Sequence, residues 1–454
     1  MFSFRGSVDR ARYAHGVEKI AALDAAFLVG ENDANPTHFS VLMVFDIPAT
    51  AGENYVREVF ERILANEDYH PVFRRVVRRM RGRPAWDSVA KPDIEHHLRF
   101  VTLPQPGGRD ELLTVIVRSR ARRLDRSRPL WEADIVDGMA GRRFAINLKI
   151  HHSLVDGIGF VRLVRDCLST DPTADDCVAM WNTPRSATGF AKPSAAGPRH
   201  PLRAFGRDAG VIRAAARRDE SLVMPYPHPI VGAGVTGSAH QTTVCSWEFE
   251  RLDAIRRSVG DVSINDVLVA ACGGALRSYL IGRGALPEAS LKAMIPMATR
   301  TVDEAGDGGN AVGAIVADLG TDRRDPFERL RIVNASTNSG KALFRSIDAR
   351  SALAWSAANM SPIYYNRFFG PRRTGRPRRF TTVVSNVPSS RDQLYFNGAA
   401  LVEVHPIGLV TKGLDLNIAL SNTARSVDFG VVTTIPDTQR FIDHYERALQ
   451  DLER

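Results

Sequence analysis

The seven residues from His151 to Gly157, with the sequence HHSLVDG, constrain the fold of this chain more than any other stretch. Before them, the large apolar side chains between Arg143 and Ile150 fall on every second position, which is the period of a half-buried strand. After them, the apolar residues from Phe160 to Leu168 recur at helical spacing. The pattern predicts a strand-to-helix turn, where side chains are directed into a cleft. Two adjacent imidazoles point in different directions there, so we expect one to do chemistry and the other to be held by the protein.

The chemistry that fits this turn is proton abstraction from a hydroxyl group. A histidine near its ordinary pKa of about 6.5 serves as a general base at neutral pH when a hydrogen bond fixes its tautomer. Asp156, four residues after His152, is able to orient that ring. It is equally able to pair with an arginine and brace the loop, and a backbone carbonyl would then fix the tautomer. Gly157 permits a positive φ or a close backbone approach where the helix begins.

The composition and charge of the chain narrow its partners. The 454 residues carry a net charge of +9, and arginine greatly outnumbers lysine. Arginine suits phosphate groups and anionic surfaces, so a phosphorylated cofactor, an acidic membrane face and nucleic acid are the candidates. No basic helix with interleaved aromatic residues and no zinc-finger spacing is present, so we expect no nucleic-acid partner. The cysteines are far apart and show no CxxC spacing, which predicts neither a disulfide framework nor a zinc site and favours a reducing compartment: Cys167, Cys177, Cys245 and Cys272.

Membrane contact is expected to be peripheral. Residues 1–17 lack the apolar core of a signal peptide, and no run of 18 apolar residues occurs. We therefore expect a cytoplasmic protein, with peripheral association at the inner membrane or at lipid droplets as an option. The stretch from Phe73 to Arg81 places arginine pairs around an apolar pair. It predicts a strand hairpin with a basic face, and contact with an anionic lipid or cofactor is the alternative to a merely solvated surface.

The length of the chain predicts two domains of roughly 200 residues each. Residues 1–19 form an N-terminal extension, and residues 20–170 form a first lobe that contains HHSLVDG. Residues 171–240 hold eight of the 25 prolines, which predicts a linker or crossover. Residues 241–454 form a second lobe. In this lobe Ser263 is expected to cap a long helix whose first turn contains Asn265 and Asp266, and Asn386 ends a predicted strand.

HHSLVDG resembles the HHxxxDG motif of the bacterial wax ester synthase/acyl-CoA:diacylglycerol acyltransferase family, which includes mycobacterial triacylglycerol synthases. Four further matches to that family lie along the chain, two before HHSLVDG and two after it, and together they span nearly the whole chain: Leu23–Leu28 (LDAAFL), Pro129–Glu132 (PLWE), Ile264–Val267 (INDV) and Ser385–Pro388 (SNVP). Two features depart from the family. Its asparagine and arginine pair is not recognisable in residues 227–241, and its Gly-Pro after SNVP is replaced by Ser389-Ser390.

The resemblance implies an α/β fold of the α+β kind. It consists of two lobes like those of chloramphenicol acetyltransferase, each a mixed sheet with helices. A crossover linker joins the lobes, and a channel lies between them.

The resemblance also implies a reaction, the transfer of an acyl group from acyl-CoA to a lipophilic alcohol. Diacylglycerol as acceptor yields triacylglycerol, and a long-chain alcohol yields a wax ester. His152 would act as the general base, His151 and Asp156 would arrange the loop, and Gly157 would give room. Asn265 and Asn386, which the family shares, would line the acyl or oxyanion region.

Acyl-CoA is a co-substrate in this interpretation, and no bound cofactor is expected. The alcohol attacks directly, so no nucleophilic serine is required. Adjacent histidines rarely present their nitrogens to one ion, so we expect no metal at this site. Two alternatives stay open: an acyltransferase that takes its acyl group from a carrier protein, and a catalytically silent lipid-binding relative of the enzymes.

Overall fold

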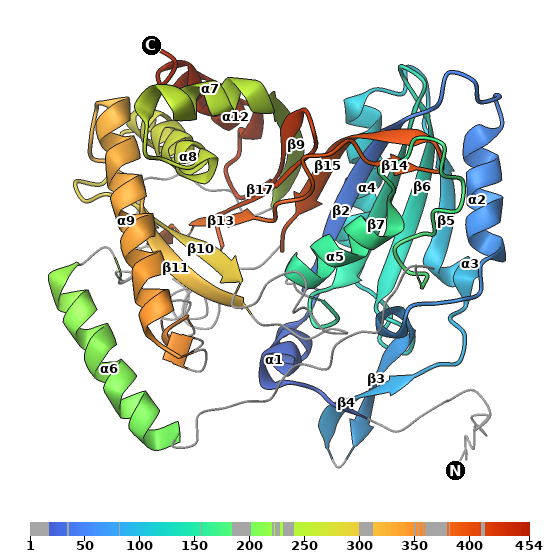
Figure 1. Cartoon of the computed structure of the whole chain (residues 1–454), viewed down its shortest axis with the longest axis horizontal. Helices are drawn as coiled ribbons and strands as arrows, with labels where there is room; N and C mark the ends of the chain where they lie inside the picture. Colours follow the sequence, from blue (N-terminus) through green and yellow to red (C-terminus); the bar gives the residue numbers. More distant parts are fainter. Residues whose placement is uncertain are drawn as a thin grey trace.

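The computed structural model places the chain in two lobes, each built on a six-stranded mixed sheet (Figure 1). It describes residues 18–33, 36–80, 82–155, 157–183, 201–219, 222, 228–229, 240–298, 312–348, 351–352, 354–356, 358, 379–380, 382–409 and 414–454.

The first lobe holds the histidine pair. Its sheet has the strand order β14-β15-β2-β7-β6-β5, and every neighbouring pair is antiparallel except β5 and β6. The strands are β2 (His38–Asp46), β5 (Leu98–Thr102), β6 (Trp131–Met139), β7 (Arg143–His151), β14 (Tyr395–Phe396) and β15 (Ala399–Ile407). The accompanying helices are α1 (Ala22–Gly30), α2 (Tyr55–Ala65), α3 (Ile94–His97), α4 (Arg109–Ala121) and α5 (Gly157–Cys167).

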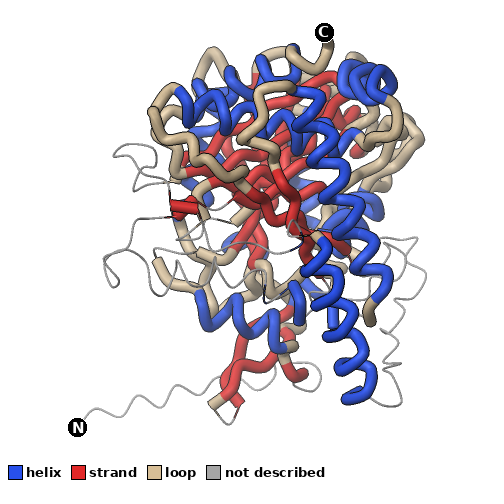
Figure 2. The backbone as a smooth tube through the Cα atoms, turned by 90° about the vertical axis from the view of Figure 1, so that its left-hand side faces the viewer, coloured by secondary structure: helices blue, strands red, loops and turns tan. Residues whose placement is uncertain are grey.

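A smaller sheet extends from the first lobe. Its strands are β1 (Glu18–Lys19), β4 (Arg83–Ser88) and β3 (Arg75–Met80), in that order. β3 and β4 form a hairpin that projects at one end of the molecule, close to α1, in both views (Figures 1 and 2). The predicted strand hairpin is therefore confirmed.

The second lobe has the strand order β11-β10-β13-β16-β17-β9, in which β13 runs parallel to β10 and to β16. The helix α6 (Pro201–Arg218) packs beside α9. The strands are β9 (Gln241–Glu248), β10 (Lys292–Ala298), β11 (Val312–Asp318), β13 (Thr382–Asn386), β16 (Leu416–Asn422) and β17 (Ser426–Thr433). The helices are α7 (Phe249–Val259), α8 (Ile264–Ile281), α9 (Pro326–Ser346) and α12 (Thr438–Gln450), and β8 (His228–Pro229) pairs with β12 (Arg379–Phe380). The two mixed sheets with their helices confirm the predicted two-lobed α/β fold.

Strand β15 joins the lobes, although it comes from the second half of the sequence. It pairs with β2 from Ala400 opposite Asp46 to Ile407 opposite Ser40. It also lies against β17, where a Cβ atom added to Gly430 would meet the carbonyl oxygen of Pro406 at 2.0 Å. Only glycine fits at such a close backbone approach. The predicted boundary at residue 241 divides the sequence, but it does not divide the two sheets. The sheet of the first lobe includes β14 and β15, which come after that boundary.

Two residues of PLWE explain why this segment is structurally fixed. Trp131 is fully buried, stacks on His97, and donates its indole N–H to the carbonyl of Phe73 at 2.9 Å. The next residue, Glu132, pairs with the fully buried Lys149 on β7 at 3.1 Å and with Arg99 at 2.8 Å. A buried lysine needs such a partner, because an uncompensated charge in the interior is costly. The segment therefore supports the strand that ends in the histidine pair.

Among the described residues, α8 is the one helix long and apolar enough to cross a membrane by length and composition. Most of it, 72%, is buried inside the protein, where it packs against α9 and α12. This burial identifies α8 as the core helix of the second lobe.

Candidate active site

The histidine pair lies where β7 turns into α5. The strand ends at His151, residues 152–155 form the turn, and α5 begins at Gly157. β2 runs antiparallel beside β7 and places His38 opposite His151. The strand-to-helix turn predicted from the hydrophobic period is confirmed. Asp156 lies outside the described residues, so its assigned role stays a prediction.

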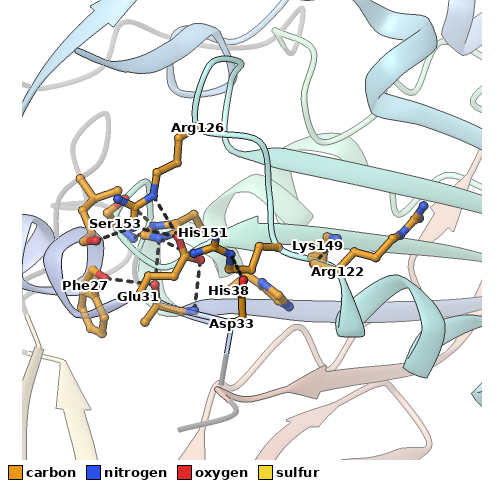
Figure 3. A network of polar contacts seen from close by, with 12 residues as sticks. Phe27, Glu31, Asp33, His38, Arg122, Arg126, Lys149, His151 and Ser153 are labelled. Atoms are coloured by element: carbon orange, nitrogen blue, oxygen red, sulfur yellow. Dashed lines mark hydrogen bonds and ion pairs between the residues drawn. The ribbon is translucent and has the colours of Figure 1, made fainter. Parts of the chain in front are cut away.

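His151 is fully buried, and both of its ring nitrogens have partners (Figure 3). The backbone N–H of Ser153 donates to Nδ1 at 3.1 Å, and the Ser153 hydroxyl lies 2.6 Å from the same nitrogen. A backbone N–H only donates, so Nδ1 is the accepting nitrogen and Nε2 carries the proton. Nε2 then donates to Thr37 Oγ1 at 2.8 Å, and the Thr37 hydroxyl donates to the carbonyl of Phe27 at 3.1 Å. These contacts assign a single tautomer to His151.

The environment of His151 keeps the ring neutral. Burial lowers the pKa of His151 to about 3, and the positive charge of Arg126 and the neighbouring His152 add to this effect. The carboxylate of Glu31 lies 3.8 Å from Nε2, but it is already paired with Arg126 at 2.9 Å. We therefore assign a neutral ring. Because both nitrogens are occupied and buried, this is the environment of an anchoring residue.

His152 has a different environment. Its backbone N–H donates to the carbonyl of Thr37 at 3.0 Å, and its side chain is half-buried. The imidazole stacks on the ring of Phe27, with centroids 4.4 Å apart and an angle of 20° between the planes. The edge contact with Phe39 has a centroid distance of 5.4 Å. Of the two histidines, His152 is the partly exposed one, and partial exposure is what the sequence interpretation requires of a base.

Gly157 is the first residue of α5, and its φ is not positive. A Cβ atom at this position would lie 3.4 Å from a methyl group of Val387. The HHSLVDG turn therefore meets the SNVP segment of the second half of the chain. A Cβ atom at this distance makes ordinary van der Waals contact, and it meets a side chain rather than backbone, so the described residues show neither of the two uses predicted for this glycine.

Asn265 and Asp266 differ in how well the fold explains them. Ser263 caps α8 by accepting from the N–H of Asp266 at 3.2 Å, and the Asp266 carboxylate accepts from the N–H of Ser263 at 2.9 Å. The hydroxyl of Thr337 also donates to Asp266 at 2.8 Å. This capping box accounts for Asp266 structurally. Asn265 Oδ1, in contrast, is buried without a hydrogen-bond partner among the described residues.

Asn386 is the last residue of β13, and its side chain is exposed. Within the described part of the chain, no hydrogen bond joins Asn265 or Asn386 to the histidine pair. Their assignment to the acyl or oxyanion region therefore stays a prediction. The described residues also contain no group of three or more His, Cys, Asp and Glu side chains able to hold a metal ion.

Four residues around the histidine pair were missed by the sequence reasoning: Phe27, Glu31, Thr37 and Arg126. Phe27 belongs to the matched LDAAFL segment, so a signal for it was present. Arg126 lies 95 residues from Glu31, and a contact over such a separation leaves no pattern in a single sequence.

Comparisons with known proteins agree with the fold and the motif. The family model described as the wax ester synthase/diacylglycerol acyltransferase catalytic domain matches residues 20–268, and the model described as the WS/DGAT C-terminal domain matches residues 308–453. A protein of Mycobacterium tuberculosis named as a probable diacylglycerol O-acyltransferase is 36% identical over 450 residues, which is 95% of this chain and 98% of that protein.

Solved structures show the same architecture. The wax ester synthase/diacylglycerol acyltransferase from Marinobacter aquaeolei VT8 matches with a TM-score of 0.75 at 27% identity, covering 96% of this chain and 98% of that chain. The first condensation domain of the calcium-dependent antibiotic synthetase matches with a TM-score of 0.59 at 13% identity, over 96% of each chain, and shares the two-lobed fold. The matched models and the relative of nearly equal length lead to one conclusion: this chain belongs to the wax ester synthase/diacylglycerol acyltransferase family.

Proposed function

We propose that this chain is an acyl-CoA-dependent O-acyltransferase that esterifies diacylglycerol, a long-chain alcohol, or both. The observation that carries the proposal is the difference between the two histidines of the motif. His151 is buried, neutral and bonded at both nitrogens, whereas His152 is only half-buried beside it. A site with one anchoring histidine and one accessible histidine suits general-base catalysis on a hydroxyl group.

The reaction proceeds without an acyl-enzyme intermediate. His152 takes the proton of the alcohol as its oxygen attacks the thioester carbonyl, the carbon–sulfur bond breaks, and the proton passes to the departing thiolate of CoA. Ser153 is an unsuitable nucleophile, because its side chain is buried. Burial also raises the pKa of all the cysteine thiols, which disfavours the reactive thiolate: Cys167, Cys177, Cys245 and Cys272.

The names of the relatives support acyl transfer to diacylglycerol or to an alcohol that yields a wax ester. Acyl-CoA as donor rests on the resemblance of HHSLVDG to the family motif. The test incubates purified protein with labelled palmitoyl-CoA and either dioleoylglycerol or hexadecanol, and separates the neutral lipids. We expect labelled triacylglycerol, labelled wax ester, or both. Product from a palmitoylated carrier protein, with none from palmitoyl-CoA, would replace the proposed donor. Lipid binding without any product would identify a silent relative.

We further propose that the enzyme resides in the cytoplasm and meets its acceptor at an anionic membrane surface, through the tip of the β3–β4 hairpin. The segment from Arg78 to Arg83 contains four arginines and no acidic residue. Arg79 and Arg83 are exposed and form no ion pair with a described residue, and the side chain of Met80 between them is 49% exposed. A cluster of arginines beside an exposed apolar side chain matches the charge of anionic headgroups.

Replacing Arg79 and Arg83 together with glutamine is expected to weaken binding to vesicles that contain phosphatidylglycerol by about thirtyfold, since each basic residue near an anionic surface contributes about 1 kcal/mol, or about fivefold. Co-sedimentation at low salt measures this. Arg331→Gln combined with Arg447→Gln, two exposed arginines on α9 and α12, is the matched control and should bind like the native protein. Equal loss in both double variants, or equal binding to neutral phosphatidylcholine vesicles, would contradict a role for the hairpin.

A further inference from the structure

The ring of the proposed base rests on a side chain from a different element. His152 belongs to the turn after β7, whereas Phe27, whose ring stacks on it, belongs to α1. The stacked face limits rotation of the imidazole, and Phe39 makes an edge contact with the same ring. The orientation of His152 therefore depends on how firmly α1 is held. Figure 3 shows Phe27, His151 and the residues that surround them.

One connection to α1 runs through the buried histidine. In this chain of two hydrogen bonds, His151 Nε2 donates to the Thr37 hydroxyl, and the Thr37 hydroxyl donates to the carbonyl of Phe27. His151 is thus linked, through Thr37, to the backbone of the residue whose ring contacts His152. Because every group in this chain of hydrogen bonds is buried or partly buried, water competes weakly for them.

A second connection holds the C-terminal end of α1. Glu31 follows the last residue of the helix, and its carboxylate is almost completely buried, with 1% of the side chain exposed. Arg126 donates to this carboxylate from Nε at 3.1 Å and from Nη2 at 2.9 Å, and it also donates to the carbonyl of Leu28. The other carboxylate oxygen lies 3.5 Å from the N–H of Thr37. A guanidinium at a helix C-terminus satisfies free carbonyl groups and suits the helix dipole.

We propose that α1 is the positioning element of the catalytic base: Phe27 sets the orientation of the His152 ring, and the Glu31–Arg126 ion pair together with Thr37 holds Phe27 in place. These are positioning residues, because they act on His152 and not on the substrate. The inference rests on the proposed role of His152. A small displacement of the catalytic base slows the reaction, because proton transfer requires a near-attack geometry. Loss of a positioning residue should therefore lower kcat with little change in KM.

Phe27→Leu is the first test, since leucine keeps the apolar contact but removes the flat ring. We expect kcat to fall by about tenfold to a hundredfold, with KM and the midpoint of thermal unfolding nearly unchanged. Phe27→Tyr keeps the ring and should restore kcat. Glu31→Gln keeps the shape of the carboxylate but removes its charge, and Arg126 stays solvated because 42% of its side chain is exposed. This variant should lower kcat by less than Phe27→Leu.

A spectroscopic readout makes the inference testable without activity. In protein with isotope-labelled histidine, the ring current of Phe27 shifts the Cε1–H resonance of His152. Phe27→Leu should abolish this shift, Phe27→Tyr should keep it, and Val29→Ala, on the exposed face of the same helix, should leave it unchanged.

The outcomes separate this inference from the proposed function. An active native protein whose Phe27→Leu variant loses the ring-current shift but keeps its kcat would overturn the positioning role and leave the proposed function intact. An unchanged resonance in that variant would overturn the stacking itself. An inactive native protein with the expected resonance changes would reject the proposed function while keeping the geometry.

Discussion

Replacing His152 with asparagine is expected to lower kcat/KM for acyl transfer by about a hundredfold to ten-thousandfold, the usual contribution of a positioned general base. Asparagine has a similar size, but it cannot take up the proton of the attacking hydroxyl. The half-buried ring of His152 contributes little to the core compared with its neighbour. The variant should therefore unfold at nearly the same denaturant concentration as the native protein.

His151→Asn is the contrasting variant. It removes a fully buried ring with hydrogen bonds at both nitrogens, so activity and stability should fall together, the latter by about 1 to 3 kcal/mol. Ester formation and chemical unfolding of both variants measure the difference. A His152→Asn protein that retains full activity would reject His152 as the base.

Acidification to about pH 5 is expected to lower the free energy of unfolding by about 2 kcal/mol for each buried neutral histidine. Burial lowers the pKa of His151 to about 3 and the pKa values of His70 and His97 to about 4, and it lowers that of His38 as well. Above pH 6.5 these rings are neutral in both the folded and the unfolded chain. Below pH 6.5 these histidines bind protons in the unfolded chain but stay neutral in the folded chain. The free energy of unfolding therefore falls as the pH drops from about 6.5 toward 4.

His151, His70 and His97 together are expected to lower the free energy of unfolding by about 6 kcal/mol at pH 5, a large share of the stability of an ordinary domain. Urea unfolding at pH 7.5 and at pH 5, followed by tryptophan fluorescence, measures the loss. In His97→Gln the loss should shrink by about 2 kcal/mol, whereas His96→Gln, at the partly exposed neighbour, should leave it unchanged. An unfolding free energy that is the same at the two pH values would show that these histidines are charged or solvated in the folded protein.

The sequence predicts best the parts of the site that depend on local periodicity. The alternating side chains of β7 and the helical spacing after Gly157 place the histidine pair in its turn. The strand hairpin and the Ser263 cap of α8 also depend only on neighbouring residues. In each case a few consecutive side chains determine the backbone, so a single sequence is sufficient.

Contacts between distant segments are what the sequence cannot predict. β15 pairs with β2 although more than 350 residues separate the paired positions. Nothing in the sequence of either strand indicates which strand it pairs with. The same holds for the Glu31–Arg126 ion pair and for Thr37 beside His151, whose separations are 95 and 114 residues. These contacts depend on tertiary packing, and they decide which histidine is anchored and which is accessible.

The proposed acyl transfer is tested most directly by measuring both products of one reaction mixture. Purified protein is incubated with palmitoyl-CoA and dioleoylglycerol or hexadecanol, and the free CoA thiol and the new ester are quantified together over time. We expect equal amounts of free CoA thiol and new ester at every time point, and no release of CoA without an alcohol. CoA release that does not depend on the alcohol, or the absence of ester with either acceptor, would contradict the proposed acyl transfer.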